Sequence, residues 1–208
     1  MNVKILACAF ILCSFISGCG AARPSNYYQL TVPQDLVPSG RPDPYPVTLM
    51  IGPITSSELY RQDHIVYTDR GESMGMYQYH RWAEPPTEMI AEVLLRALRS
   101  SGHLQSVYMW GSDVHGDYLL RGRLYDFREV SATPLMGRVT LELELRNTRT
   151  GATVWTHVYS HDEPVAGKDV SAVVAALDRN TQRGIGEFIA SLDQYFSTHP
   201  PASVSPSR

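Results

Sequence analysis

The sequence predicts an α+β sandwich, in which a mixed, largely antiparallel sheet carries two main helices on one face. The clearest strand signal is the alternation of Val139, Leu141, Leu143 and Leu145 with polar residues, which indicates one buried and one wet face. Two other segments, 86–101 and 170–196, place apolar residues every three or four positions, as amphipathic helices do. Several strands, a helix, more strands and a long helix follow one another in that order, and no internal repeat is visible.

The two helices have recognisable ends. Pro85 and Pro86 suit the first turn of the shorter helix, and Gly102 after Ser101 is typical of a helix end. Its apolar face is formed by Met89, Ile90, Val93, Leu94 and Leu98. Asp169 is a favourable N-cap for the longer helix, which is expected to run from Val170 to about Phe196. Its apolar stripe is formed by Val170, Val173, Val174, Leu177, Ile185, Phe188, Ile189, Leu192 and Phe196.

Two glycines interrupt the longer helix. Gly184 and Gly186 each weaken it by about 1 kcal/mol relative to alanine. We therefore expect a bend or a close contact at this point.

Short apolar and β-branched runs separated by turn residues predict the remaining strands. They are residues 27–32, 47–54, 64–68, 76–82, 107–110, 118–130, 139–146 and 153–160. Residues 56–62 are expected to form one helical turn, 33–46 a proline-rich loop, and 71–75 and 149–151 tight turns.

The N-terminus has the layout of a signal peptide. Lys4 supplies a positive charge, and the next twelve residues, 5–16, are uncharged and mainly apolar. A membrane-spanning helix needs about 20 such residues, so a permanent transmembrane anchor is not expected. The segment ends in Ile16-Ser17-Gly18-Cys19, which resembles the lipobox of bacterial lipoproteins. We therefore predict cleavage after Gly18 and lipidation of the Cys19 thiol; the alternative is an ordinary secreted protein with a chance cysteine.

Lipidation would anchor the protein firmly. Lipoproteins of this class carry three acyl chains, such as palmitate, and two chains already hold a protein stably in a membrane. Gly20 stands where an aspartate usually retains a Gram-negative lipoprotein in the inner membrane, which implies the outer membrane, facing the periplasm. Cys8 and Cys13 would leave with the signal peptide, so neither a disulfide nor thiol catalysis is expected in the mature chain.

The predicted organisation is a signal peptide (1–18), the lipidated cysteine with a tether (19–26), one folded domain (27–197) and a disordered tail (198–208). The seven residues from Gly20 to Asn26 reach about 23–25 Å when extended, which keeps the domain near its membrane. The mature chain carries 17 basic and 21 acidic residues, a net charge of −4. Such a charge favours neither nucleic acid nor an anionic lipid surface as a partner.

No sequence motif indicates an enzyme or a cofactor. The G-x-S-x-G, H-E-x-x-H, P-loop and G-x-G-x-x-G patterns are absent from the sequence. Ser112 and Asp113 with His115 could form a nucleophile loop, but a polar turn explains them better.

A metal site is equally unsupported. Its candidates are His157, His161, Asp162 and Glu163, yet two histidines four positions apart on a strand lie about 13 Å from each other. The apolar stripes of both helices are interpreted as core, with lipid binding as the alternative.

Three groups of residues together resemble a known family. They are Tyr27-Tyr28-x-Leu30 after the cysteine, Leu49-x-Ile51-Gly52-Pro53 with Tyr60-Arg61-Gln62 and Ile65-Val66-Tyr67, and Tyr79-His80-Arg81-Trp82-Ala83-Glu84-Pro85. The chain resembles the auxiliary lipoprotein component of ABC-type transport systems, the family that includes the lipoprotein of the paraquat-inducible intermembrane system. The resemblance runs from about Tyr27 to Leu192, and Arg81-Trp82-Ala83-Glu84-Pro85 is its most specific part.

The resemblance implies a function without catalysis. Such lipoproteins accompany an inner-membrane permease, a cytoplasmic ATPase and a periplasmic Mce-domain protein, which are thought to move phospholipid between membranes. It also implies that Tyr27, Tyr28, Leu30, Arg81 and Trp82 are structural or touch a partner. Self-association and phospholipid binding by the domain stay open. The alternatives are an envelope assembly factor or cell-wall synthase activator on a similar scaffold, and a lipid-anchored hydrolase that uses Ser112 or His115.

Overall fold

The computed structural model describes residues 23–32, 43–68 and 73–201. The predicted signal peptide, Cys19 and the first part of the tether therefore lie outside the described residues. So do 33–42 of the predicted proline-rich loop, 69–72 around the predicted turn, and 202–208 of the predicted tail.

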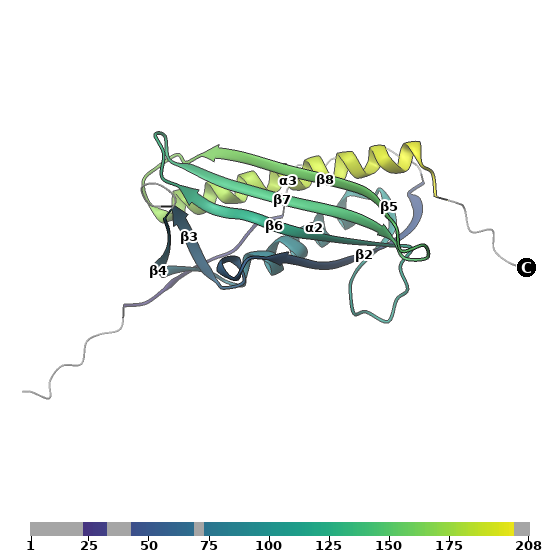
Figure 1. Cartoon of the computed structure of the whole chain (residues 1–208), viewed down its shortest axis with the longest axis horizontal. Helices are drawn as coiled ribbons and strands as arrows, with labels where there is room; N and C mark the ends of the chain where they lie inside the picture. Colours follow the sequence, from purple (N-terminus) through teal and green to yellow (C-terminus); the bar gives the residue numbers. More distant parts are fainter. Residues whose placement is uncertain (1–22, 33–42, 69–72, 202–208) are drawn as a thin grey trace, which may run out of the picture.

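Among the described residues, eight strands form one mixed sheet (Figure 1). They are β1 (Asn26–Tyr28), β2 (Tyr45–Ser56), β3 (His64–Thr68), β4 (Met74–Trp82), β5 (Leu104–Met109), β6 (Tyr118–Val130), β7 (Met136–Asn147) and β8 (Thr153–Pro164). The longest ladders are antiparallel and join β6 to β7 and β7 to β8.

The other side of β6 is shared by two strands. β2 pairs in parallel with its first half, between Tyr118 and Leu124, and β3 pairs in parallel with its last three residues, Arg128–Val130. β5 then extends the sheet beyond β2, while β4 and β1 extend it beyond β3. The sheet therefore divides into two arms on this side, one ending in β5 and the other in β1.

The predicted α+β fold is confirmed. Helices α2 (Pro86–Ser101) and α3 (Val170–Thr198) cover the same face of the sheet, and the opposite face of β6, β7 and β8 lies open (Figure 1). α3 packs mainly on β7 and β8, α2 on β2 and β5, and the two helices touch each other. One 3-10 turn, Glu58–Tyr60, lies where a helical turn was predicted.

The core lies between the sheet and the two helices. Val139, Leu141, Leu143 and Leu145 of β7 are all buried, as their alternation predicts. The apolar stripe of α3 faces β7 and β8, and that of α2 faces β2 and β5, so the interpretation of both stripes as core holds. Burial of each such side chain contributes about 1.5–3 kcal/mol before the entropy of ordering it is considered.

The ends of the helices follow the sequence signals. Pro86 is the first residue of α2. Gly102, which follows the last residue of the helix, has a left-handed φ of 65°. The Asp169 side chain accepts a 2.8 Å hydrogen bond from the Ala172 backbone N–H, so it caps α3 as predicted.

Some boundaries differ from the prediction. β1 ends at Tyr28 and not at Val32, because the chain leaves β4 there and Thr31 binds Asp178 of α3. β2 already begins at Tyr45, inside the predicted loop, since that ring is buried against Phe196 of α3. β8 extends four residues past Ser160, because its polar end is paired with α3.

Candidate docking surface

The residues of the family motif meet where the first strand joins the sheet. β1 lies parallel to β4, with Tyr27 opposite Arg81 and Tyr28 opposite Trp82. The Tyr27 ring is 64% exposed, whereas Tyr28 is half buried and its hydroxyl lies 2.9 Å from His80 Nδ1. Leu30 is buried in the core. Adjacent positions on this strand thus face opposite sides.

Arg81 and Trp82 have clear structural tasks. The Trp82 ring is fully buried, with its centroid 5.2 Å from that of Phe127. Arg81 donates a 2.8 Å hydrogen bond to Asp63 Oδ1 and does not pair with Glu84. Ala83 donates through its backbone N–H to the Tyr28 carbonyl, at 2.7 Å. These contacts fix the first residues after the tether against the domain.

The same N-terminal segment is also held by α3. Thr31 donates two hydrogen bonds to Asp178, from its backbone N–H at 2.8 Å and from its hydroxyl at 2.6 Å. Gln182, one turn further along, donates to the Thr31 hydroxyl at 2.6 Å. The segment from Tyr28 to Thr31 is therefore attached both to β4 and to α3.

Two open hollows flank a loop at the far end of β5. The first, of about 760 Å³, lies between α2 and the ends of β2 and β5. The second, of about 700 Å³, lies beneath residues 110–117. Trp110 lines both hollows, and its ring is 62% exposed. We call residues 110–117 the Trp110 loop and the first hollow the α2 groove.

The Trp110 loop is fixed at both ends. The Trp110 N–H donates to the Ile51 carbonyl at 2.8 Å, and the Asp117 N–H donates to the Thr48 carbonyl at 2.8 Å. Asp117 and Thr48 share a second hydrogen bond, in which Asp117 Oδ2 accepts from the Thr48 N–H at 2.8 Å. Thr148, from the turn that follows β7, donates its hydroxyl to the Gly116 carbonyl at 2.6 Å. A large exposed aromatic ring is thus presented on backbone that is anchored to β2 and to the end of β7.

Two loop glycines permit this path. Gly111 has a φ of 92°, a conformation that side-chain-bearing residues rarely adopt. A Cβ on Gly116 would lie 2.3 Å from Met50 Cγ and 3.2 Å from the Thr48 carbonyl oxygen. Both positions therefore favour glycine for a geometric reason.

Ser112 and His115 both line the second hollow. Neither the Ser112 hydroxyl nor the His115 ring makes a side-chain hydrogen bond to any described residue, and in particular the two do not bond to each other. A serine nucleophile needs a base within hydrogen-bond reach and a further group that orients that base. The contacts present here fit the polar-turn interpretation.

The four candidate metal ligands lie on opposite faces of β8. His157, His161 and Glu163 face α3, whereas Asp162 faces away and is held by Arg138 through two 2.7 Å hydrogen bonds. This bidentate pairing holds the pKa of Asp162 below its usual range. Across the described ranges, no three His, Cys, Asp or Glu side chains are grouped closely enough to hold a metal ion.

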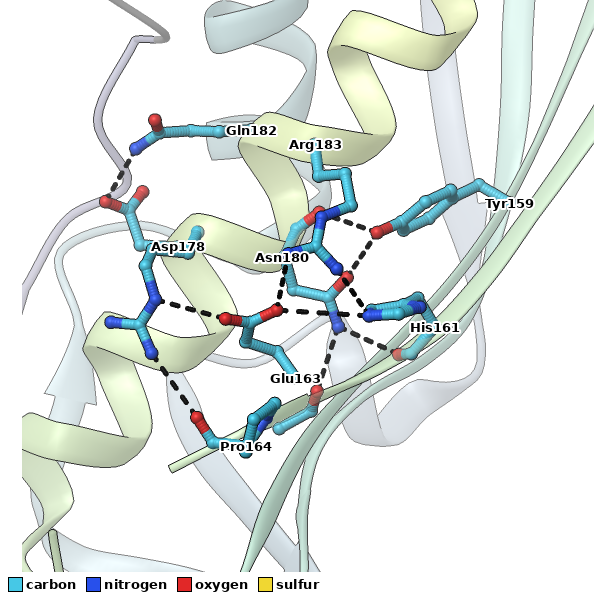
Figure 2. Close-up of polar contacts among 10 residues, drawn as sticks. Tyr159, His161, Glu163, Pro164, Asp178, Asn180, Gln182 and Arg183 are labelled. Atoms are coloured by element: carbon cyan, nitrogen blue, oxygen red, sulfur yellow. Dashed lines mark hydrogen bonds and ion pairs between the residues drawn. The ribbon is translucent and has the colours of Figure 1, made fainter. Parts of the chain in front are cut away.

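The face of β8 that meets α3 forms a closed polar network. Figure 2 shows Asn180 and Arg183 reaching from α3 toward Tyr159, His161 and Glu163. The fully buried Asn180 donates to the carbonyls of Gly137 and His161, at 2.9 and 2.8 Å, and accepts from the Tyr159 hydroxyl.

The charges of this network are paired as well. Glu163 accepts from Arg183 at 2.9 Å and from Arg179 at 3.2 Å. Burial raises the pKa of Tyr159 to about 12, so the phenol keeps its proton at neutral pH. The network satisfies its own buried groups, and we assign it to helix–sheet attachment.

The open face of the sheet is covered with paired charges. Arg121 binds Glu144 and Arg138 binds Asp162 across neighbouring strands, and the Tyr125 hydroxyl donates to Glu142 at 2.7 Å. Such a surface suits water better than an acyl chain. In the part of the chain that the structure describes, no helix combines the length and apolar character needed to cross a bilayer.

The fold and these surfaces define a class: an α+β domain whose N-terminal segment is hydrogen-bonded to β4 and α3 and whose exposed Trp110 loop is hydrogen-bonded to β2. A family model for the ABC-type transport auxiliary lipoprotein component matches residues 28–187. The chain therefore belongs to this family, and it is a lipoprotein component auxiliary to ABC-type transport.

Solved structures support the fold. Protein XCC0632 from Xanthomonas campestris matches with a TM-score of 0.75 and 18% identity, over 84% of this chain and 98% of that one. A structure titled only as an uncharacterized protein matches with a TM-score of 0.65 and 13% identity, over 82% of this chain and 99% of that one. At these identities the likeness concerns the fold alone. A comparison with curated proteins gives no match.

Proposed function

We propose that this chain is an outer-membrane lipoprotein, anchored through acyl chains on Cys19 and facing the periplasm, that docks an ABC/Mce-type system for intermembrane lipid transport. Its partners are a periplasmic Mce-domain protein and, through it, an inner-membrane permease and a cytoplasmic ATPase. Its contribution is binding and assembly, without catalysis.

The family match carries this proposal. It covers residues 28–187, which include nearly all of the described domain from β1 into α3. The motif residues from Tyr28 to Trp82 fall inside the match. The match therefore supports an assignment of the domain as a whole to this family's role.

The candidate docking surface extends from the N-terminal segment to the Trp110 loop. β1, which follows the tether, lies beside β4 at the left of Figure 1, whereas the loop that follows β5 lies toward the right. A tether of seven residues spans about 23–25 Å, so the partner must come to the domain. Trp110 lines the α2 groove together with Gln29, which follows β1, so a partner in this groove would also meet the segment that follows the tether.

The test is a crosslinked pull-down of the membrane-anchored protein, with mass spectrometry of the captured proteins and lipids. We expect an Mce-domain protein, with the permease and ATPase recovered through it. Capture of a secretin or of a cell-wall synthase in place of these proteins would contradict the transport assignment and favour the assembly-factor or activator alternatives.

A second assay addresses the hydrolase alternative. We expect the purified protein to show no ester or glycan hydrolysis that depends on Ser112 or His115, since no described contact prepares either group for attack. Turnover that disappears in both Ser112→Ala and His115→Ala would contradict a role without catalysis.

A further inference from the structure

We infer that the α2 groove, together with Trp110, binds a short segment of a partner protein that carries an apolar or aromatic side chain next to lysine or arginine. This inference rests on the proposed docking function. It specifies which surface of this chain binds the partner and which side chains the bound segment carries.

The apolar part of the groove can accept a side chain. Its floor is formed by Ile51 and Ile54 of β2 and Ala91 of α2, which are themselves packed in the core. Met109 and Trp110 form one wall and remain partly exposed. A volume of about 760 Å³ is within the range of sites that bury most of a ligand.

Trp110 has the properties of a binding anchor. Its backbone is hydrogen-bonded to β2, yet most of the ring faces solvent. Tryptophan is enriched among the few residues that dominate the binding energy of protein interfaces. Because the loop is already fixed, little ordering entropy is lost when a partner covers the ring.

The rim of the groove sets the charge of the partner. Glu84, Glu88 and Glu92 follow one another at intervals of four residues along one side of the groove. Arg96 is paired with Glu92 at 2.7 Å, while Glu84 and Glu88 have no ion pair among the described residues. Two unneutralised carboxylates favour a cationic partner and repel a phosphate group.

The stability of α2 itself could explain the position of Glu88, but not the rest of the groove. Glu88 lies in the first turn of α2, where an acidic side chain is favourable in any helix. That effect does not account for an exposed tryptophan beside an apolar hollow. The coincidence of the ring, the floor and the carboxylates therefore favours a basic, partly apolar protein segment over a phospholipid headgroup.

The test compares variants in the crosslinked pull-down from membranes. Trp110→Ser should reduce recovery of the transport component at least about tenfold, the loss typical of an interface anchor. The double variant Glu84→Gln/Glu88→Gln should reduce recovery at low salt, and the difference from wild type should shrink at high salt, because salt screens exposed charges.

Tyr125→Ser and Glu142→Gln are the matched controls. They change an exposed aromatic ring and a carboxylate on the open face of the sheet, and they should recover the partner as wild type does. Wild-type recovery by Trp110→Ser, while wild type captures its partner, would overturn the inference and leave the proposed function standing.

If the wild-type protein captures no transport component, that result counts against the proposed function alone. A second experiment then tests the groove directly. A labelled peptide of alternating lysine and leucine should bind the purified full-length Cys19→Ala variant, and Trp110→Ser should weaken that binding. Absence of peptide binding, or Trp110-dependent binding of phosphatidylglycerol vesicles in its place, would overturn the inference.

Discussion

At the scale of single residues, Trp82 and Tyr27 belong to the same family motif but differ in burial. Trp82 is fully buried against Phe127, whereas Tyr27 is mostly exposed. Trp82→Ala should therefore lower the free energy of unfolding by about 3–5 kcal/mol. Tyr27→Ala, the control, should change it by less than about 0.5 kcal/mol. Chemical denaturation measures both, and equal losses would contradict the assignment of Trp82 to the core.

The Arg138–Asp162 pair predicts a pH dependence. Arg138 holds the Asp162 pKa below its usual range, so the pair stabilises the fold above the unfolded-state pKa. That contribution is lost as the pH falls through the folded-state pKa. Arg138→Gln should lower the free energy of unfolding by about 0.2–1 kcal/mol at pH 7, since the pair is partly exposed. This difference from wild type should narrow as the pH falls from about 4, the usual pKa of an aspartate in an unfolded chain, toward pH 3.

Denaturation at both pH values, with Arg149→Gln as the control, measures this gap. Arg149 is exposed and has no ion pair among the described residues. A gap that stays constant from pH 7 to pH 3 would show that Arg138 acts through packing and not through its charge.

Sequence patterns found the motif residues but not Trp110. Residues 107–110 were predicted as a strand, whereas β5 ends at Met109 and Trp110 begins the loop. The missing information is a long-range contact, because the Trp110 N–H bonds to Ile51, far away in the chain. One signal was available: Glu88 and Glu92 lie four residues apart in the predicted helix 86–101, which places two acidic side chains on one side of it, and Glu84 lies just before its start.

At the scale of elements, the strong periodic patterns predicted the elements well and their ends less well. The predicted range 118–130 coincides with β6, and the strict alternation around Leu141 lies within β7. β8 was predicted to end at Ser160, because His161, Asp162 and Glu163 do not resemble strand residues. Their pairing with Arg183, Arg138 and Arg179 compensates for their polarity. These arginines lie elsewhere in the chain, so the local strand propensity of residues 161–163 does not reflect them.

The two glycines of α3 provide a matched pair of variants. A Cβ on Gly184 would lie 2.8 Å from the Tyr159 ring, whereas a Cβ on Gly186 would meet no atom within 4 Å. Gly186→Ala should stabilise the protein by up to about 1 kcal/mol, because alanine is the better helix former. Gly184→Ala should destabilise it, since the buried ring must shift. Thermal unfolding compares the two, and stabilisation by both would contradict the close packing of α3 on β8.

At the scale of the whole molecule, the layer arrangement was predictable but the strand order was not. Amphipathic patterns predict that two helices cover one face, and they do. The division of one side of β6 between β2 and β3 depends on registers between strands that are distant in the sequence. Period-two patterns specify which face of a strand is buried, but they do not specify its neighbour.

Lipid anchoring and folding should be separable. Cys19→Ala removes the predicted acylation site, and no described helix could hold the domain in a bilayer. We therefore expect a folded protein in the soluble periplasmic fraction, with the unfolding midpoint of the lipidated form. Fractionation and circular dichroism test this, and a misfolded or still membrane-bound variant would show that the anchor does more than locate the domain.

Photo-crosslinking from inside the envelope tests the docking account most directly. A photoreactive residue at Val114, in the Trp110 loop, is compared with one at Val158, which is exposed on the open face of β8. We expect a crosslink from position 114 to a protein of an ABC/Mce transport system and none from position 158. Crosslinks to lipid alone from position 114, or the same protein captured from both positions, would contradict it.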